Sequence, residues 1–189
     1  MKVLVADVVD NGDINNPQVY EVSVGVVDHS QPDKHFPRKT YGIKWDTLHL
    51  GLAPEAYRMQ IFSTLIQQLR GGVEMVERHE VSQLVHDFIT QHGIEVERGV
   101  TLVTYRHFNV VNSLLSLPDW GALIPVTGSI DPTTVFLEPG DTYEQLEKRV
   151  SEKGTNVLNL RGEDGVSMGA VNLYAATLHE RYAYADDEE

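Results

Sequence analysis

The chain has 189 residues, of which 41% are hydrophobic and 23% are charged, a composition typical of a folded protein with a full core. No apolar run approaches the roughly 20 residues of a membrane-spanning helix. The first residues also lack the apolar segment of a signal peptide, so we expect no membrane association and a cytoplasmic location. The absence of cysteine excludes a disulfide framework, a thiolate metal site and a thiolate nucleophile.

The chain is strongly acidic, with 28 Asp and Glu against 15 Lys and Arg and a net charge of −13. Affinity for nucleic acid comes mostly from cations that displace counterions from phosphates. Because the basic residues form no cluster along the chain, we expect nucleic-acid binding to be weak or absent. Such acidity favours solubility and also suits a surface that meets a basic protein partner. A short acidic tail at about 185–189, which contains Asp186-Asp187-Glu188-Glu189, is expected to be solvated.

The N-terminal part predicts three strands in an antiparallel meander. The candidates are Lys2–Val9, Val19–Asp28 and Arg38–Trp45, and the segments between them hold Asn, Gly, Pro and Asp, the residues typical of turns. The second strand has two unequal faces, on which Val19, Glu21 and Ser23 alternate with Tyr20, Val22 and Val24.

Helical patterns follow. The first helix begins near Pro54 and ends at Gly71-Gly72, and the second ends at Gly93 as a C-cap. The apolar residues that define these two helices are Ile61, Leu65, Ile66 and Leu69 in the first and Val81, Leu84, Val85, Phe88 and Ile89 in the second.

A buried strand, Val100–Tyr105, and a short helix, Phe108–Leu117, which Pro118 stops, are expected next. Residues 119–165 predict a short strand near Thr134–Leu137 and a helix at Tyr143–Lys153 within irregular chain. A last helix is expected from Met168 to about Tyr184. No repeat or linker divides the chain, so we expect one domain over residues 1–189. The order of elements is that of a ribonuclease H-like α/β fold, with a mixed central sheet flanked by helices.

Four short stretches of the sequence have the spacing of motifs found in a known protein family. They are Asp7-Val8-Val9 followed by a turn with Gly12, then PQVYEVSVGVV, TYRHFNVVNSLLSL and SMGAVNLYAA. This frame resembles the DEDD superfamily of 3′–5′ exonucleases, and it is most similar to the phage branch typified by exonuclease A. In that family the first strand ends in Asp-x-Glu, Ser-Phe-Asp opens a central helix, and the final helix carries His-x-x-x-x-Asp. The positions that match these motif residues are Asp7, Val9, Asn109, Ser167 and Asn172.

The resemblance implies that the catalytic site is degenerate. The family's four carboxylates hold two divalent metals for phosphodiester cleavage, and Mg²⁺ prefers anionic oxygen. Asp7 is the only retained ligand position, because Val9 has no ligand atom and Asn109 and Asn172 offer only neutral amides. Ser167 stands where the family has its general base, and it cannot take up a proton near neutral pH. We therefore expect no catalytic residues, no metal and no other cofactor, with Asp7 held as a structural acceptor.

Four residues could replace the missing groups. Asp10 follows Asp7 closely, as does Asp13, and either would have to turn inward to take the place of the missing Glu. Asp131 lies in the segment where phage members often carry an Arg-Asp pair, although Asp-Pro is also a common turn initiator. His107 is close to Asn109 and could face the former cleft.

Two classes of function stay open. The first is a catalytically inactive exonuclease-like protein of phage origin that binds a protein partner in the host cytoplasm, as an inhibitor, an adaptor or a mimic of DNA charge. The second is a 3′–5′ exonuclease with a rebuilt or weakened site that uses Mg²⁺ or Mn²⁺. A homodimer is compatible with both, and residues 119–165 are where we expect features specific to this protein.

Overall fold

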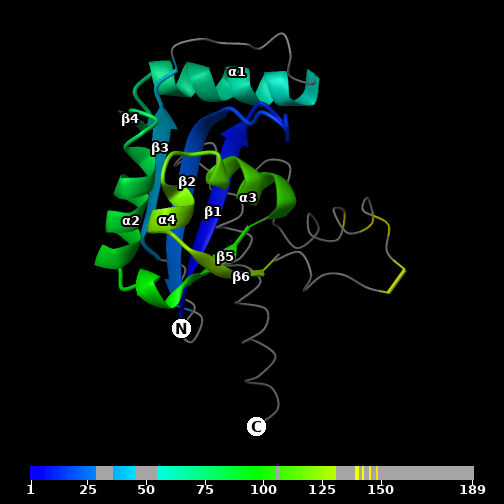
Figure 1. Cartoon of the computed structure of the whole chain (residues 1–189). Coiled ribbons are helices and arrows are strands. Elements are labelled where there is room, and N and C mark those ends of the chain that lie inside the picture. Colours follow the sequence, from blue (N-terminus) through cyan, green and yellow to red (C-terminus); the bar gives the residue numbers. More distant parts are fainter. Residues whose placement is uncertain are drawn as a thin grey trace.

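The computed structural model describes residues 1–28, 36–45, 55–104 and 107–130, together with 139, 140, 142, 145 and 148. The strands form one sheet, and helices pack against it (Figure 1). The elements, in chain order, are β1 (Lys2–Asp10), β2 (Val19–Asp28), β3 (Arg38–Ile43), α1 (Glu55–Leu69), β4 (Glu74–Val76), α2 (Val81–Gln91), the 3₁₀ helix η2 (Val96–Arg98), β5 (Val100–Val103), α3 (His107–Leu115), α4 (Trp120–Leu123) and β6 (Val126–Ile130).

The sheet has six strands in the order β4-β3-β2-β1-β5-β6. β1 pairs antiparallel with β2, and β2 pairs antiparallel with β3, so the predicted meander is confirmed. The other three pairings, β1 with β5, β3 with β4 and β5 with β6, are parallel. The sheet is therefore mixed, as the sequence predicted.

β1 lies in the interior of the sheet and is buried over nearly its whole length. Its sequence, KVLVADVVD, is a nearly continuous apolar run, which is typical of a strand that is covered on both faces. Leu4, Ala6 and Val8 belong to the main hydrophobic core. Val9 belongs to a second, smaller cluster, so successive residues of β1 serve two different layers.

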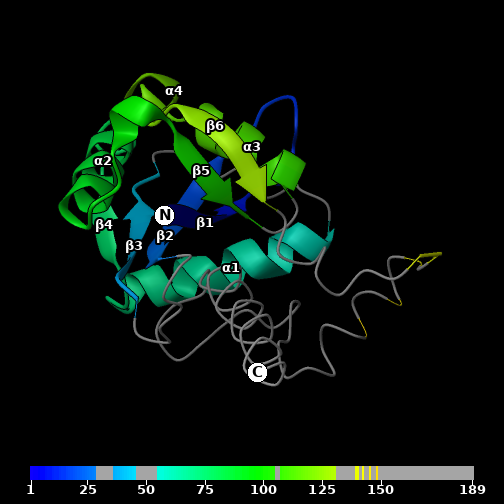
Figure 2. The same ribbon diagram turned by 90° about the horizontal axis from the view of Figure 1, so that it is seen from below.

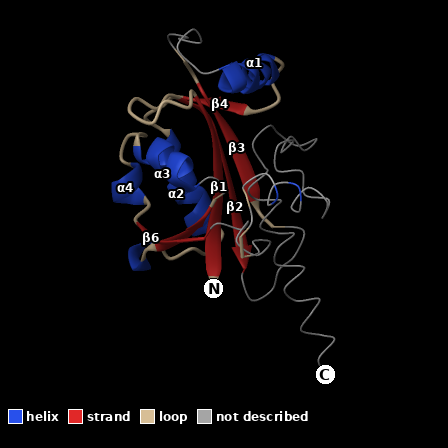
Figure 3. Ribbon diagram, turned by 90° about the vertical axis from the view of Figure 1, so that its right-hand side faces the viewer, coloured by secondary structure: helices blue, strands red, loops and turns tan. Residues whose placement is uncertain are grey.

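The helices divide between the two sides of the sheet. α2, α3 and α4 cover one face, and α1 lies on the other side across one end of the strands (Figures 2 and 3). The main core lies between the sheet and the first three of these helices, and its members include Leu4, Val22, Val24, Val85, Ile89, Leu102, Leu114, Trp120 and Ile124.

The end of α2 follows the sequence closely. The helix stops before Gly93, which takes the left-handed conformation with φ = 86°. The N–H of Ile94 donates to the carbonyl of Ile89 at 3.0 Å, and the N–H of Gly93 donates to that of Thr90 at 3.0 Å. These bonds satisfy the last carbonyls of the helix, so the predicted glycine C-cap is confirmed.

Four short elements were not predicted from the sequence: β4, η2, α4 and β6. β4 has three residues and α4 has four, which is too short for any periodic pattern to develop. β6, with the sequence VTGSI, has a glycine at its centre and is partly exposed, so it lacks the apolar run of β1. These elements are specified by their neighbours in the sheet and core, not by local pattern.

Several predicted segments lie outside the described residues. They are the strand Thr134–Leu137, the helix Met168–Tyr184 and the acidic tail. Of the predicted helix Tyr143–Lys153, residues 145 and 148 are described, and both are helical. Within the described part of the chain, no helix combines the length and apolarity needed to cross a membrane.

Candidate functional site

The carboxyl end of β1 carries the residues that matched the first family motif. Because side chains alternate along a strand, Asp7 and Val9 share one face, and Asp10 shares the opposite face with Ala6 and Val8. Asp7 and Val9 therefore lie on the same side of the sheet as α1, and Asp10 lies on the side of α3. The structure brings the first two matched positions together, and it separates Asp10 from both.

A bulge in β2 preserves this arrangement. Val9 pairs with Glu21 and Asp10 pairs with Val19, which leaves Tyr20 as an extra residue in β2. Without the bulge, the side chain of Val19 would lie on the α1 side of the sheet. With it, Val19 joins the main core on the same side as Asp10.

Asp10 is buried and accepts two hydrogen bonds. The hydroxyl of Ser113 on α3 donates to its Oδ2 at 2.5 Å, and the N–H of Gly12 donates to its Oδ1 at 2.9 Å. Burial raises the pKa of the Asp10 carboxyl, and the hydrogen bonds from Ser113 and Gly12 oppose that rise. Asp10 thus joins the β1–β2 turn to α3, and its carboxylate is not available to a site around Asp7.

The turn beyond Asp10 is held by its own side chains. Gly12 has φ = 69°, a conformation that glycine adopts without strain. The Oδ1 of Asn11 accepts from the N–H groups of Asp13 and Gln18, at 3.2 and 3.0 Å. The Oδ1 of Asp13 accepts in turn from the N–H of Asn15 at 3.0 Å. Asp13 is exposed, and its hydrogen bonds stay within this turn.

Asp7 is half-buried and lies at one end of a polar row across the sheet. Its partner on β2 is Ser23, whose partner on β3 is Thr40. The hydroxyls of Ser23 and Thr40 are 2.8 Å apart and hydrogen-bonded. The Oδ1 of Asp7 also accepts a hydrogen bond from the N–H of Val8 at 2.9 Å. We call Asp7, Ser23 and Thr40 the polar row.

Val9 lies in an apolar surrounding. It forms a buried cluster with Tyr20 of β2 and with Ile61 and Leu65 of α1, and each of the four is at most 5% exposed. The spacing of Ile61 and Leu65 places both on the face of α1 that meets the sheet. The position where the family frame has its second carboxylate is thus filled by hydrocarbon.

Glu21 is a buried carboxylate that sequence reasoning did not single out. It is 0% exposed and lies directly opposite Val9, on the same face as Asp7. Diagonal neighbours in an antiparallel pair are about 7 Å apart, a distance that a long side chain can bridge. The alternation of Glu21 and Ser23 with valines in β2 was the available signal. Only the register with β1 places Glu21 beside Asp7.

Gln68 of α1 covers this part of the sheet. Its Nε2 donates to the carbonyl of Tyr20 at 2.8 Å and lies 3.5 Å from Oε2 of Glu21. The Oε1 of Gln68 is buried and has no hydrogen-bond partner among the residues that the structure describes. Gly42 lies under this amide, and a Cβ there would come within 3.2 Å of Nε2. The amide therefore has a polar contact with Glu21 and packs closely on the strand below it.

Asn109, the match for the central carboxylate, is half-buried on α3. It lies four residues before Ser113, so the two share a stripe of the helix, and Ser113 reaches Asp10 on β1. His107 is the first residue of α3, and the structure describes its backbone only. Asp131, Ser167 and Asn172 lie outside the described residues.

The described residues offer two carboxylates on the α1 side of the sheet, Asp7 and Glu21. Among them, no group of three or more His, Cys, Asp or Glu side chains is arranged to hold a metal ion. Two carboxylates can neutralise two positive charges, half of what a pair of divalent metals carries.

An apolar groove lies elsewhere, between α3, α4 and the strands β5 and β6. Its volume is about 510 Å³. Its described lining residues include Leu102, Val111, Leu115, Trp120, Val126 and Ser129, and none of the described ones is ionisable.

The fold resembles a solved nuclease domain. The structure matches the X-ray structure of the RNase domain of the yeast Pop2 protein with a TM-score of 0.50 and 13% sequence identity, over 96% of this chain and 77% of that one. At this identity the likeness establishes the fold and nothing finer. The predicted α/β fold of the ribonuclease H-like type, with its mixed sheet flanked by helices, is confirmed. No protein-family model and no curated protein matches the sequence.

Proposed function

We propose that this chain is an exonuclease-like protein of the DEDD type, from the phage branch, that does not cleave nucleic acid and acts by binding a protein partner. The observation that carries the proposal is the enclosure of Val9 by Tyr20, Ile61 and Leu65. A metal ligand at this position would need a polar side chain and room for water, and the apolar cluster offers neither.

The surroundings of Asp10 support the same conclusion. A carboxylate recruited to replace the missing Glu would have to face Asp7, and Asp10 instead binds Ser113 on the opposite side of the sheet. Its second oxygen accepts the Gly12 N–H, so both oxygens are engaged. Asp10 therefore contributes to folding and not to a metal site.

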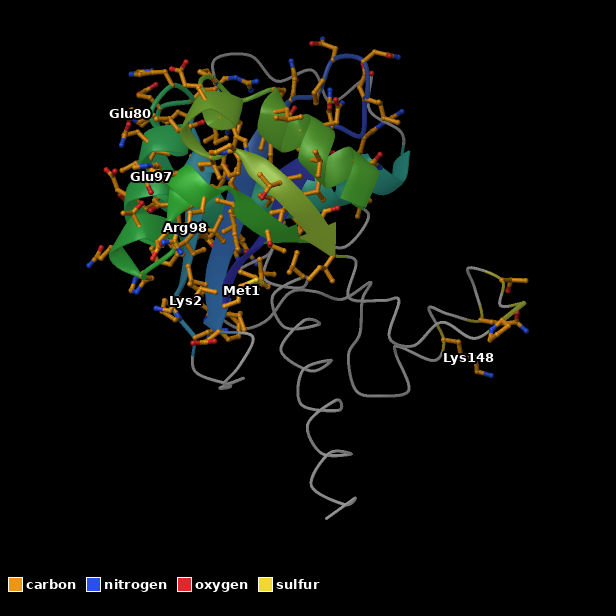
Figure 4. All side chains as sticks on the ribbon, turned by 60° about the horizontal axis from the view of Figure 1, so that its bottom comes forward. Met1, Lys2, Glu80, Glu97, Arg98 and Lys148 are labelled. Carbon is orange, nitrogen blue, oxygen red and sulfur yellow. The ribbon has the colours of Figure 1, made fainter. Side chains whose placement is uncertain are left out.

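Within the described part of the chain, the distribution of charge favours an adaptor or inhibitor over a mimic of DNA. Glu80, Glu97 and Arg98 lie on one side of the molecule (Figure 4). Three acids close to them in the sequence pair with cations: Glu74 with Lys39 at 2.6 Å, Glu77 with Lys44 at 2.8 Å and Glu95 with Arg98 at 2.7 Å. A surface of paired charges does not present the uninterrupted rows of negative charge that DNA does.

One observation favours a second candidate, a metal-dependent 3′–5′ exonuclease with a rebuilt site. Glu21 lies opposite Val9 on the face of Asp7, so a carboxylate lost from β1 has a counterpart one strand away. In this alternative, Asp7 and Glu21 would hold Mg²⁺ or Mn²⁺ together. In the proposed inactive protein, Glu21 is instead a buried acceptor beside the amide of Gln68.

Calorimetric titration of Mg²⁺ and Mn²⁺, combined with digestion of single-stranded DNA and RNA, tests the proposal on the full chain. The variants are Asp7→Asn and Glu21→Gln, which remove one charge each at nearly constant volume. Asp119→Asn is the matched control, because Asp119 is exposed and its φ of 58° suits asparagine. We expect no specific metal binding and no digestion by any of these proteins. Digestion that both Asp7→Asn and Glu21→Gln abolish, with the control unchanged, would establish the second candidate instead.

A further inference from the structure

α1 has apolar side chains on two faces. The face toward the sheet buries Ile61, Thr64, Leu65 and Gln68. The other face carries Met59, Phe62 and Leu69, which are 70%, 56% and 80% exposed, and the half-buried Ile66. We call Met59, Phe62, Ile66 and Leu69 the α1 seam. A helix on the surface of a protein normally presents polar residues to water, so this second apolar face is unusual.

The spacing of the α1 seam suits another helix. The steps from Met59 to Phe62, Ile66 and Leu69 are three, four and three residues, the repeat that two packed helices use for their shared surface. α1 also lies at the outer end of the sheet, so one side of the helix points away from the strands (Figure 1). Met and Phe are enriched at the centres of protein interfaces, and Met adapts its shape to different partners.

The charge around the seam differs from that of the chain as a whole. Residues 58–70, RMQIFSTLIQQLR, contain two arginines and no acid, in a protein with a net charge of −13. Arg58 and Arg70 lie at the two ends of the seam, and both are exposed. An apolar stripe between cations complements an apolar stripe between carboxylates.

We propose that the α1 seam is the docking surface for an amphipathic helix of a protein partner whose apolar stripe is flanked by Asp or Glu. This inference rests on the proposed function as a binding protein, and it names the surface and the chemistry of the partner. The apolar side chains of the partner pack between Met59, Phe62, Ile66 and Leu69, and its carboxylates meet the arginines at the rim.

A second copy of this chain fits the seam less well. Pairing two copies of residues 58–70 would gather four arginines around one apolar contact, and the single acid of α1, Glu55, lies outside this stretch. Like charges at the edge of such a contact oppose association. A helix that supplies its own acids avoids the charge conflict.

The test uses two synthetic helical peptides of about three heptads with leucine at the a and d positions. One peptide carries Glu at the flanking e and g positions, and the other carries Lys. Binding to the full chain is measured by fluorescence anisotropy. The variant Phe62→Glu disrupts the seam, and Leu115→Glu on α3 is the matched control because Leu115 is 57% exposed against 56% for Phe62. Arg70→Glu tests the contribution of charge.

We expect the Glu peptide to bind at least about tenfold more tightly than the Lys peptide, a difference of about 1.4 kcal/mol. Phe62→Glu should lose this binding, Leu115→Glu should keep it, and Arg70→Glu should narrow or reverse the preference between the peptides. Equal binding of the two peptides, binding of neither, or retention by Phe62→Glu would overturn the proposal. So would a wild-type dimer in analytical ultracentrifugation that Phe62→Glu dissolves, because a second copy would then cover the seam.

The outcome can be separated from that of the proposed function. Digestion of nucleic acid that requires Asp7 would contradict the inactive protein whatever the peptides do. If the Glu peptide does not bind, and neither metal binding nor digestion is detected, the α1 seam is not the docking surface but the proposed function is not contradicted.

Discussion

The two faces of the sheet place Asp7 and Asp10, which are three residues apart on β1, in different surroundings. On the side of α2, α3 and α4, Asp10 is buried at the edge of a large apolar core, and Ser113 and Gly12 occupy both of its oxygens. On the side of α1, Asp7 lies at the end of the polar row, with Glu21 one step away and an apolar cluster at Val9. One face is a packed core, and the other holds polar groups at the end of β1.

The largest effect is expected for Val9→Glu, which places a carboxylate in an apolar cluster. Burying an unpaired charge next to Glu21 should lower the free energy of unfolding by about 4 kcal/mol, measured by urea denaturation. The Val9→Gln variant introduces a side chain of similar size without a charge, so its free energy of unfolding should fall by less than that of Val9→Glu. Added Mn²⁺ should leave the Val9→Glu variant unchanged, and recovery of its stability with Mn²⁺ would mean that the α1 side retains a metal site.

Leu4→Ala tests the packed face. Leu4 is fully buried in the main core, and its truncation should lower the free energy of unfolding by about 3 kcal/mol, because it removes apolar contacts and leaves a cavity. Leu69→Ala on the α1 seam is the counterpart, and it should change stability by less than about 0.5 kcal/mol. Equal losses in chemical denaturation would mean that the seam is packed and not exposed.

Asp10→Ala tests the connection between the β1–β2 turn and α3. The substitution leaves the Ser113 hydroxyl and the Gly12 N–H without their acceptor, and it should lower the free energy of unfolding by about 2 kcal/mol. Asp10→Asn keeps an acceptor for one donor and should cost clearly less at neutral pH. Urea denaturation measures both variants. An equal fall in the free energy of unfolding for Asp10→Ala and Asp10→Asn would show that the charge of Asp10 is needed.

The smallest effect concerns pH. Burial raises the pKa of Asp10 above its ordinary value of 3.8, so the folded protein holds a proton that the unfolded chain releases. Stability from this group is therefore complete below 3.8 and is lost as the pH rises through the pKa of the folded state. Asp10→Asn has no such loss. The unfolding free energy of the variant relative to wild type should rise from pH 3.8 upward, and a fall over this range would contradict the raised pKa.

Much of the fold could be predicted from local pattern. β2 spans Val19–Asp28 as expected, β1 extends one residue beyond its predicted end, and α2 stops at the glycine that the sequence marked. β3 ends at Ile43, two residues earlier than predicted, after its last pairing with β4. Long apolar runs and helix caps carry their own signal, because burial and backbone geometry act within a few residues.

The candidate site was less predictable. Asp7 and Val9 could be placed on one face from the alternation of a strand. The surroundings of each could not, because Tyr20, Ile61 and Leu65 come from two other elements. From the sequence, Glu21 could be recognised only as a polar residue in a valine-rich strand. The hydrogen bond between Asp10 and Ser113 could not be predicted, because the two residues are 103 positions apart in the chain.

The sequence by itself determined the class of fold and the meander of β1, β2 and β3. These properties follow from patterns within single segments. The tertiary structure alone decided which carboxylates share a face, what fills the space beside Val9, and that α1 presents a second apolar face to water. Such properties depend on strand register and helix placement, which arise from contacts between residues far apart in the chain.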